Sequence, residues 1–165
     1  MKELISDLIE ALREELKQYG EMLALLDQQQ ALVTHRQTTE LPENVNHVNA
    51  QAAVLAVARH AREERQRQIA RALAAPETAG LLVLLPQLPA DYQPLIGALV
   101  SENNELLTRV QNRARQNHLL LSHCVELMQQ LIHSIFPASH PVTYNESGRL
   151  PVGETNTRSL YQAVG

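Results

Sequence analysis

The stretch from Asp91 to Phe136 constrains the fold most, because its only proline is Pro94, near its start, and its only glycine is Gly97. We expect this stretch to form a single long helix. At about 1.5 Å per residue, a helix of that length extends ~65 Å, which is longer than a compact domain of this size is wide. Such a helix needs other helices alongside it.

Apolar residues in this stretch recur mostly four and three positions apart, as in a coiled-coil seam. One step breaks the alternation, because between Val110 and Ala114 a spacing of four follows another four, which is a stutter. Asn103 and Asn117 occupy seam positions and either fix the register or lie at the edge of a drifting stripe. The seam consists of Tyr92, Ile96, Leu99, Asn103, Leu106, Val110, Ala114, Asn117, Leu121, Cys124, Met128, Leu131 and Ile135.

The second half of the long helix carries more apolar residues than one seam requires. The excess predicts either a broad core face packed against two helices or a groove for the amphipathic helix of a partner. The residues outside the seam are Leu119, Leu120, Val125, Leu127, Ile132 and Phe136.

Two further helices are expected before the long one, since the chain has few glycines and is rich in good helix formers, while aromatic residues make up only 3%. The first runs from about Lys2 to the mid-thirties, and the second from near Pro42 to about Ala75. Between Ala50 and Ala61, small apolar residues occupy nearly every face of the second helix. This pattern predicts close packing on both sides of that helix.

The connector from Glu77 to Pro89 is expected to hold one short apolar helix, Leu81 to Leu85, that caps an end of the bundle. After Phe136 the composition changes to Pro, Gly, Ser, Thr and Asn, which is typical of a segment without its own core. The predicted fold is therefore all-α: an elongated helical hairpin plus a third long helix, in a coiled-coil-like bundle over residues 1–136. An irregular C-terminal tail over residues 137–165 follows and is expected to dock on a partner.

Charge and motifs argue against several functional classes. The formal charge of −4 disfavours an obligatory nucleic-acid binder. The second helix is locally basic, but it lacks aromatic residues for base stacking, so we interpret its arginines as a solvated face with intrahelical ion pairs. These arginines are Arg59, Arg62, Arg65, Arg67 and Arg71.

Catalytic and metal-binding groupings are not evident from the spacing of the residues. The seven histidines do not form a convergent ligand set, and there is no phosphate-binding glycine loop or nucleophile elbow. The lone Cys124 excludes an internal disulfide and fits a small apolar group on the seam. We therefore expect no enzyme, no metal and no cofactor.

The N-terminus does not read as a signal peptide, because Glu3, Asp7 and Glu10 interrupt any apolar run. The run Leu81–Leu85 is too short to cross a bilayer. We expect a soluble, cytoplasmic protein without membrane insertion.

Two elements near the C-terminus resemble the FlgN family of flagellar export chaperones. The first is the Leu-rich part of the long helix around Asn117 to Leu121, within NHLLLSHCVELMQQLI, and the second is a Tyr…Gly element that begins at Val142 and holds Tyr144 and Gly148. The resemblance implies a cytosolic chaperone that binds hook-filament junction (hook-associated) proteins, prevents their premature assembly and delivers them to the type III export gate.

The resemblance also implies roles for individual residues. Family members bind their substrate proteins through the last helix and tail, which corresponds here to Asn117, Leu120, Leu127, Leu131 and Phe136. A tyrosine near the end of the chain is linked to docking on the export gate, which corresponds to Tyr144 with Gly148. Binding of this kind requires neither ATP nor a metal.

A structural coiled-coil adaptor that associates with itself is the alternative function. In that case the exposed stripe of the long helix would form a homodimer that persists when a partner is added. A chaperone dimer would instead give way to a complex with the partner.

Overall fold

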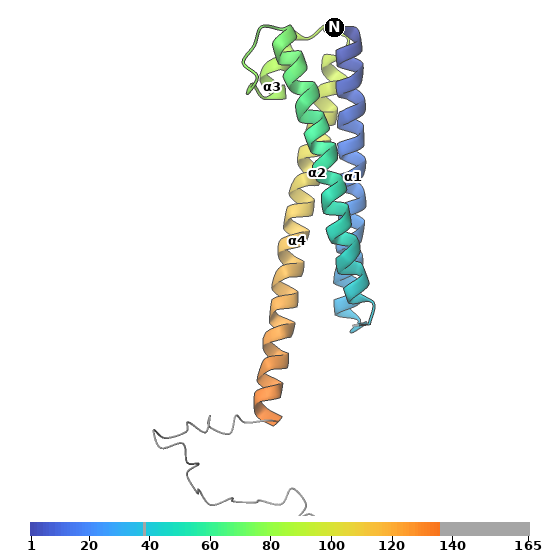
Figure 1. Ribbon diagram of the computed structural model, residues 1–165, viewed down its shortest axis with the longest axis vertical. Helices are drawn as coiled ribbons and strands as arrows, with labels where there is room; N and C mark the ends of the chain where they lie inside the picture. The colour runs from blue at the N-terminus through green and yellow to red at the C-terminus, as the bar shows by residue number, and fades with distance from the viewer. Residues whose placement is uncertain (38, 136–165) are drawn as a thin grey trace, which may run out of the picture. The chain divides into compact units, whose positions relative to one another are not determined.

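The computed structural model describes residues 1–37 and 39–135, which form helices joined by short loops (Figure 1). The helices are α1 (Lys2–Thr34), α2 (Leu41–Ala72), α3 (Leu81–Leu84), the 3₁₀ turn η1 (Leu85–Gln87) and α4 (Gln93–Ile135). No strand occurs among these residues, and the predicted all-α class is confirmed.

The chain divides into two compact units, Met1–His123 and Cys124–Gly165. The first unit holds the bundle, and the described part of the second is the last turns of α4. The predicted boundary between residues 136 and 137 lies outside the described residues and stays a prediction.

α1 is the central helix of the first unit. α1 and α2 form an antiparallel hairpin (Figure 1), and α4 packs on a second face of α1, where Asn103 and Asn117 donate hydrogen bonds to the carbonyls of Leu12 and Leu26. Because α1 has helical neighbours on two sides, its buried residues cover more than the single stripe that the sequence indicates. They are Ile5, Leu8, Ile9, Leu12, Glu15, Gln18, Tyr19, Met22, Leu26, Gln29 and Leu32.

The main hydrophobic core lies at the end of the bundle where α3 and η1 pack. Leu84 of α3 and Leu88 after η1 are buried against the first turns of α1, the last turns of α2 and the start of α4. The prediction that the short connector helix caps an end of the bundle is confirmed. The other buried members of this core are Ile5, Leu8, Ile9, Leu12, Ile69, Ala70, Ile96, Leu99 and Val100.

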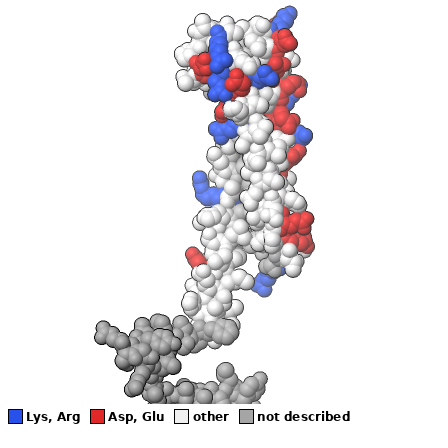
Figure 2. Space-filling view, viewed as in Figure 1, with Lys and Arg blue, Asp and Glu red and all other residues white. Residues whose placement is uncertain are grey.

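The middle of α2 differs from the sequence-based expectation. Close packing on both sides was predicted between Ala50 and Ala61, but most of its small residues are exposed, and Val57 is 71% exposed. The expectation is wrong because α2 packs closely against only one helix, α1. Residues 44–58 contain no Asp, Glu, Lys or Arg, and the middle of α2 is correspondingly white in Figure 2, between the charged ends of the bundle.

α1 and α2 are also joined by a buried ion pair. Arg62 Nε donates a hydrogen bond of 2.9 Å to Glu15 Oε2, and the Tyr19 hydroxyl donates one of 3.3 Å to Glu15 Oε1. Burial, together with the neighbouring Glu15 carboxylate, raises the pKa of Tyr19. Arg62 thus departs from the predicted solvated face, whereas Arg59 and Arg67 form the expected intrahelical pairs with Glu63 and Glu64.

Two asparagines set the register of α4 on α1. Asn103 Nδ2 donates to the Leu12 carbonyl at 3.1 Å, and Asn117 Nδ2 donates to the Leu26 carbonyl at 2.7 Å. Each bond joins residues 91 positions apart, so the helices run parallel and keep one alignment across the stutter. Both asparagines are buried, which supports the interpretation that they fix the register.

The seam deviates at the stutter itself. Ala114, which was predicted to lie on the seam, is exposed, because a step of four from Val110 turns it about 40° off the contact, whereas Asn117, seven residues after Val110, returns to α1. Arg113 Nε instead forms an ion pair of 2.6 Å with Asp27. A polar contact therefore replaces an apolar one at this level of the bundle.

Candidate protein-binding surface on α4

The C-terminal part of α4 exposes large apolar side chains. The exposed fractions are Leu119 63%, Val125 53%, Leu127 52%, Met128 64%, Leu131 58%, Ile132 57% and Ile135 60%. Scattered exposed leucines are normal on a protein surface, but a contiguous set of this size marks an interaction site. We take residues 119–135 as the candidate site and call them the α4 apolar segment.

Helical geometry gathers most of these residues on one side. At 3.6 residues per turn, nine apolar side chains fall within an arc of about 160°. They are Leu120, Leu121, Cys124, Val125, Leu127, Met128, Leu131, Ile132 and Ile135. The opposite side carries the polar residues Ser122, His123, Glu126, Gln129, Gln130, His133 and Ser134. Glu126 is the only Asp, Glu, Lys or Arg between residues 116 and 135, so the segment is nearly neutral.

The structure places the predicted substrate-binding residues in different environments. Leu127 and Leu131 are exposed on the apolar side, and Leu120 is half-buried. Asn117 is buried and hydrogen-bonded to α1, where its Nδ2 also donates to Gln29 Oε1 at 3.0 Å. Phe136 lies outside the described residues.

The predicted export-gate residues, Tyr144 and Gly148, also lie outside the described residues. Their roles stay predictions that rest on the family resemblance.

The predicted seam does not continue as a buried surface to the end of α4. Met128, Leu131 and Ile135 were placed on it, but all three are more than half exposed, and Cys124 is only partly buried. Of the two readings of the apolar excess, a core face and a partner groove, the exposures favour the groove. The sequence placed Met128 and Ile135 on the seam but left the burial of this surface open, because periodicity shows which residues share a face and not whether a neighbour covers it.

Within residues 1–37 and 39–135, no three His, Cys, Asp or Glu residues converge in an arrangement that could hold a metal ion. In the same part of the chain, no helix combines the length and apolar character needed to cross a membrane.

The fold and the α4 apolar segment define an all-α protein with an uncovered apolar helix surface. The family model described as FlgN protein matches residues 1–151, and the chain therefore belongs to the FlgN family of flagellar export chaperones. Searches of curated proteins and of solved structures gave no significant match. Family membership confirms the resemblance drawn from the Leu-rich helix and the Tyr…Gly element.

Proposed function

We propose that this chaperone binds hook-associated proteins in the cytoplasm through the α4 apolar segment, keeps them from assembling and delivers them to the type III export gate. The observation that carries the proposal is the exposure of six large apolar side chains between Val125 and Ile135, on one side of α4, in a member of the FlgN family. No catalytic step is involved, because shielding a partner requires only a complementary surface.

The chemistry of the segment indicates what it would bind. A wide apolar side with a polar back is the surface that accepts an amphipathic helix in a groove. Terminal segments of an unassembled junction protein could supply such a helix and order on binding, as disordered segments do when a partner lets them bury apolar residues. Since the segment has one charged residue, the contact would depend on apolar area more than on ion pairs.

Binding to purified hook-associated proteins tests the proposal directly. Leu127→Asp and Leu131→Asp place a charge on the apolar side and should weaken binding by about tenfold or more, because each removes buried apolar contact and buries a charge. Titration calorimetry with the full-length chain measures the affinity. Gln129→Asp and Gln130→Asp, which add the same charge to the polar side, serve as controls and should bind normally.

The proposal also predicts weak dependence on salt. Affinity should change less than about twofold between roughly 0.1 and 0.5 M NaCl, because screening acts on charges that this surface lacks. Failure of hook-associated proteins to bind, or equal effects of the apolar and polar substitutions, would refute the proposal. Tyr144→Ala should leave affinity unchanged and reduce secretion if Tyr144 acts at the export gate.

The adaptor alternative rests on the same exposed segment and predicts a different assembly. Light scattering should then show a concentration-dependent homodimer that a hook-associated protein does not dissociate. A chaperone dimer would be replaced by a complex with that protein. Leu127→Asp would weaken the homodimer of an adaptor and the complex of a chaperone, so the two assemblies must be measured separately.

A further inference from the structure

The last part of α4, residues 124–135, has an apolar side whose width can be compared with the buried sides of the other helices. Successive side chains of an α-helix are rotated by about 100°, so the direction of each one follows from its residue number. On that basis the apolar side chains from Cys124 to Ile135 span an arc of about 160°, with Leu127 at one margin and Val125 at the other. Leu127 is 52% exposed and Val125 is 53% exposed, so both margins are uncovered.

The first part of α4 shows how wide the buried stripe is when a helix packs mainly along one long helix. The buried side chains within residues 96–117 fall in an arc of about 100°. This part of α4 lies against α1, to which Asn103 and Asn117 donate hydrogen bonds. One long neighbour therefore buries a stripe that is clearly narrower than the apolar side of residues 124–135.

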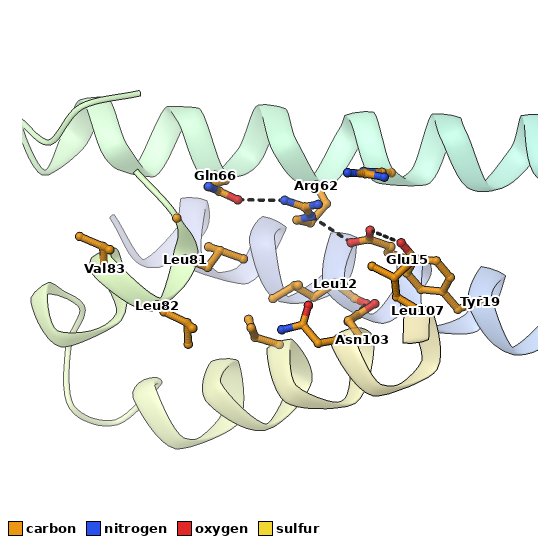
Figure 3. A pocket seen from close by; sticks show the side chains of 14 residues that line it. Leu12, Glu15, Tyr19, Arg62, Gln66, Leu81, Leu82, Val83, Asn103 and Leu107 are labelled. Carbon is orange, nitrogen blue, oxygen red and sulfur yellow. Dashed lines mark hydrogen bonds and ion pairs between the residues drawn. The ribbon is translucent and has the colours of Figure 1, made fainter. Parts of the chain in front are cut away.

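α1 gives the corresponding width for a helix with two long neighbours. Its buried side chains within residues 5–19 span an arc of about 180°. In Figure 3, Glu15 turns to Arg62 of α2, which donates a hydrogen bond to it. Leu12, about one turn earlier, lies beside Asn103 of α4, which donates to the Leu12 carbonyl. The arc of about 160° at the end of α4 is thus close to that of a helix with neighbours on two sides.

The sequence of the arc indicates how docked helices would run and what they would present. Along its centre, from Cys124 to Ile135, the seam residues are spaced four, three and four positions apart, which is the heptad spacing of helices that lie nearly along one another. The arc contains no charged residue, because Glu126 lies on the opposite side of the helix, so uncharged apolar side chains complement it. Residues 124–135 extend about 18 Å, which corresponds to roughly three turns of each docked helix.

We propose that the end of α4 docks two helical segments of one substrate molecule, one on each margin of the arc, so that a local three-helix bundle forms. The inference rests on the proposed function and specifies the form in which the substrate is bound. One segment covers the margin at Leu127, the other covers the margin at Val125 and Ile132, and both contact the seam between them. The two segments belong to one molecule, because a linked second segment binds at a high effective concentration.

Cross-saturation in methyl NMR tests the proposal with the full-length chain and a purified hook-associated protein. Irradiation of the protonated partner weakens the signals of those methyl groups of the deuterated chaperone that the partner contacts. Signal loss is expected at both margins, at Leu127 and at Val125, in a complex of one partner molecule per chaperone. Val57 and Leu82, which are 71% and 67% exposed on the first unit, are the controls and should keep their signals.

Matched substitutions at the two margins give an independent measurement. Leu127→Asp and Ile132→Asp, at positions 52% and 57% exposed, should each weaken binding by about tenfold, because each places a charge under one of the two docked helices. Gln130→Asp adds the same charge to the polar side and should leave the affinity unchanged. Titration calorimetry gives both the affinity and the stoichiometry.

The possible outcomes separate this inference from the proposed function. If the partner binds but weakens the signals of one margin alone, and only one of the two margin substitutions lowers the affinity, the two-helix inference is wrong and the proposed function stands. Two partner molecules per chaperone, signal loss at Val57 and Leu82 equal to that at the margins, or a homo-oligomer of α4 ends that the partner does not dissociate would also overturn it. Absence of any binding would refute the inference and the proposed function together.

Discussion

α1 and α2 have nearly the same length, 33 and 32 residues, yet α1 buries eleven side chains and α2 only four. The difference follows from position, because α1 contacts helices on two sides and α2 packs closely on one. It also explains the composition of α2, because most of its alanines lie on the exposed side, where they present little apolar area to water. Hydrophobic content alone is thus a poor guide to which helix holds a bundle together.

The largest expected effect is a loss of stability on truncating an α1 core residue. Leu8 is fully buried, so Leu8→Ala should lower the free energy of unfolding by about 2–5 kcal/mol. Val57→Ala on exposed α2 should change it by less than about 0.5 kcal/mol. Urea unfolding followed by circular dichroism measures both. A large loss for Val57→Ala would mean that the middle of α2 is covered in solution, and the contrast between the helices would fail.

The buried ion pair should have the next largest effect. Glu15→Ala leaves the Arg62 guanidinium, 18% exposed, without its carboxylate, and should cost about 2–3 kcal/mol. Glu63→Ala removes an exposed partner of Arg59 and should cost less than about 0.5 kcal/mol. The double variant Glu15→Leu with Arg62→Leu should regain most of the loss, since apolar pairs often replace buried ion pairs without penalty. If Glu15→Ala and Glu63→Ala lower the free energy of unfolding by the same amount, the buried Glu15–Arg62 ion pair contributes no more than a surface ion pair.

The smallest effect concerns the two helix ends, where α1 and α2 behave alike. Arg36 and Ala74 follow the last turns with φ of 58° and 55°, and the next residues donate to Leu32 and Ala70 in the Schellman pattern. Ala74→Gly and Arg36→Gly should each stabilise the fold by about 1 kcal/mol, because glycine adopts positive φ without strain. Ala61→Gly, at an exposed position inside α2, is the control and should destabilise by about 1 kcal/mol. Thermal unfolding shows whether each variant is more or less stable than the wild type. Destabilisation by Ala74→Gly would contradict the positive φ of Ala74.

Much of the fold could be predicted from the sequence. Prolines and the apolar spacing placed the three long helices, and the observed starts and ends differ by only a few residues. The residues that fix the register of α4 could be identified from the sequence, since Asn103 and Asn117 are polar residues on an apolar seam. Which helix faces are buried was not predictable. Spacing shows which residues share a face, and only the packed structure shows whether a neighbouring helix lies against that face. For this reason the middle of α2 was expected to be buried and the end of α4 was left undecided.

The candidate site was only partly predictable for the same reason. Leu127 and Leu131 were chosen through the family resemblance, and both are exposed. The buried ion pair was not anticipated, because Glu15 and Arg62 are far apart in sequence and form no motif. A glutamate at the edge of the apolar stripe of α1 was the one signal that could have indicated a buried charge.

The repeated asparagine contacts have a consequence for how such chains can evolve. Since Asn103 and Asn117 meet Leu12 and Leu26 at one constant offset, a residue inserted or deleted between Leu12 and Leu26 must be matched by the same change between Asn103 and Asn117. The connector from Leu73 to Tyr92 is under no such restriction. Length variation among relatives should therefore be coupled within the two facing helix segments, whereas in the connector it should occur away from the buried Leu84 and Leu88.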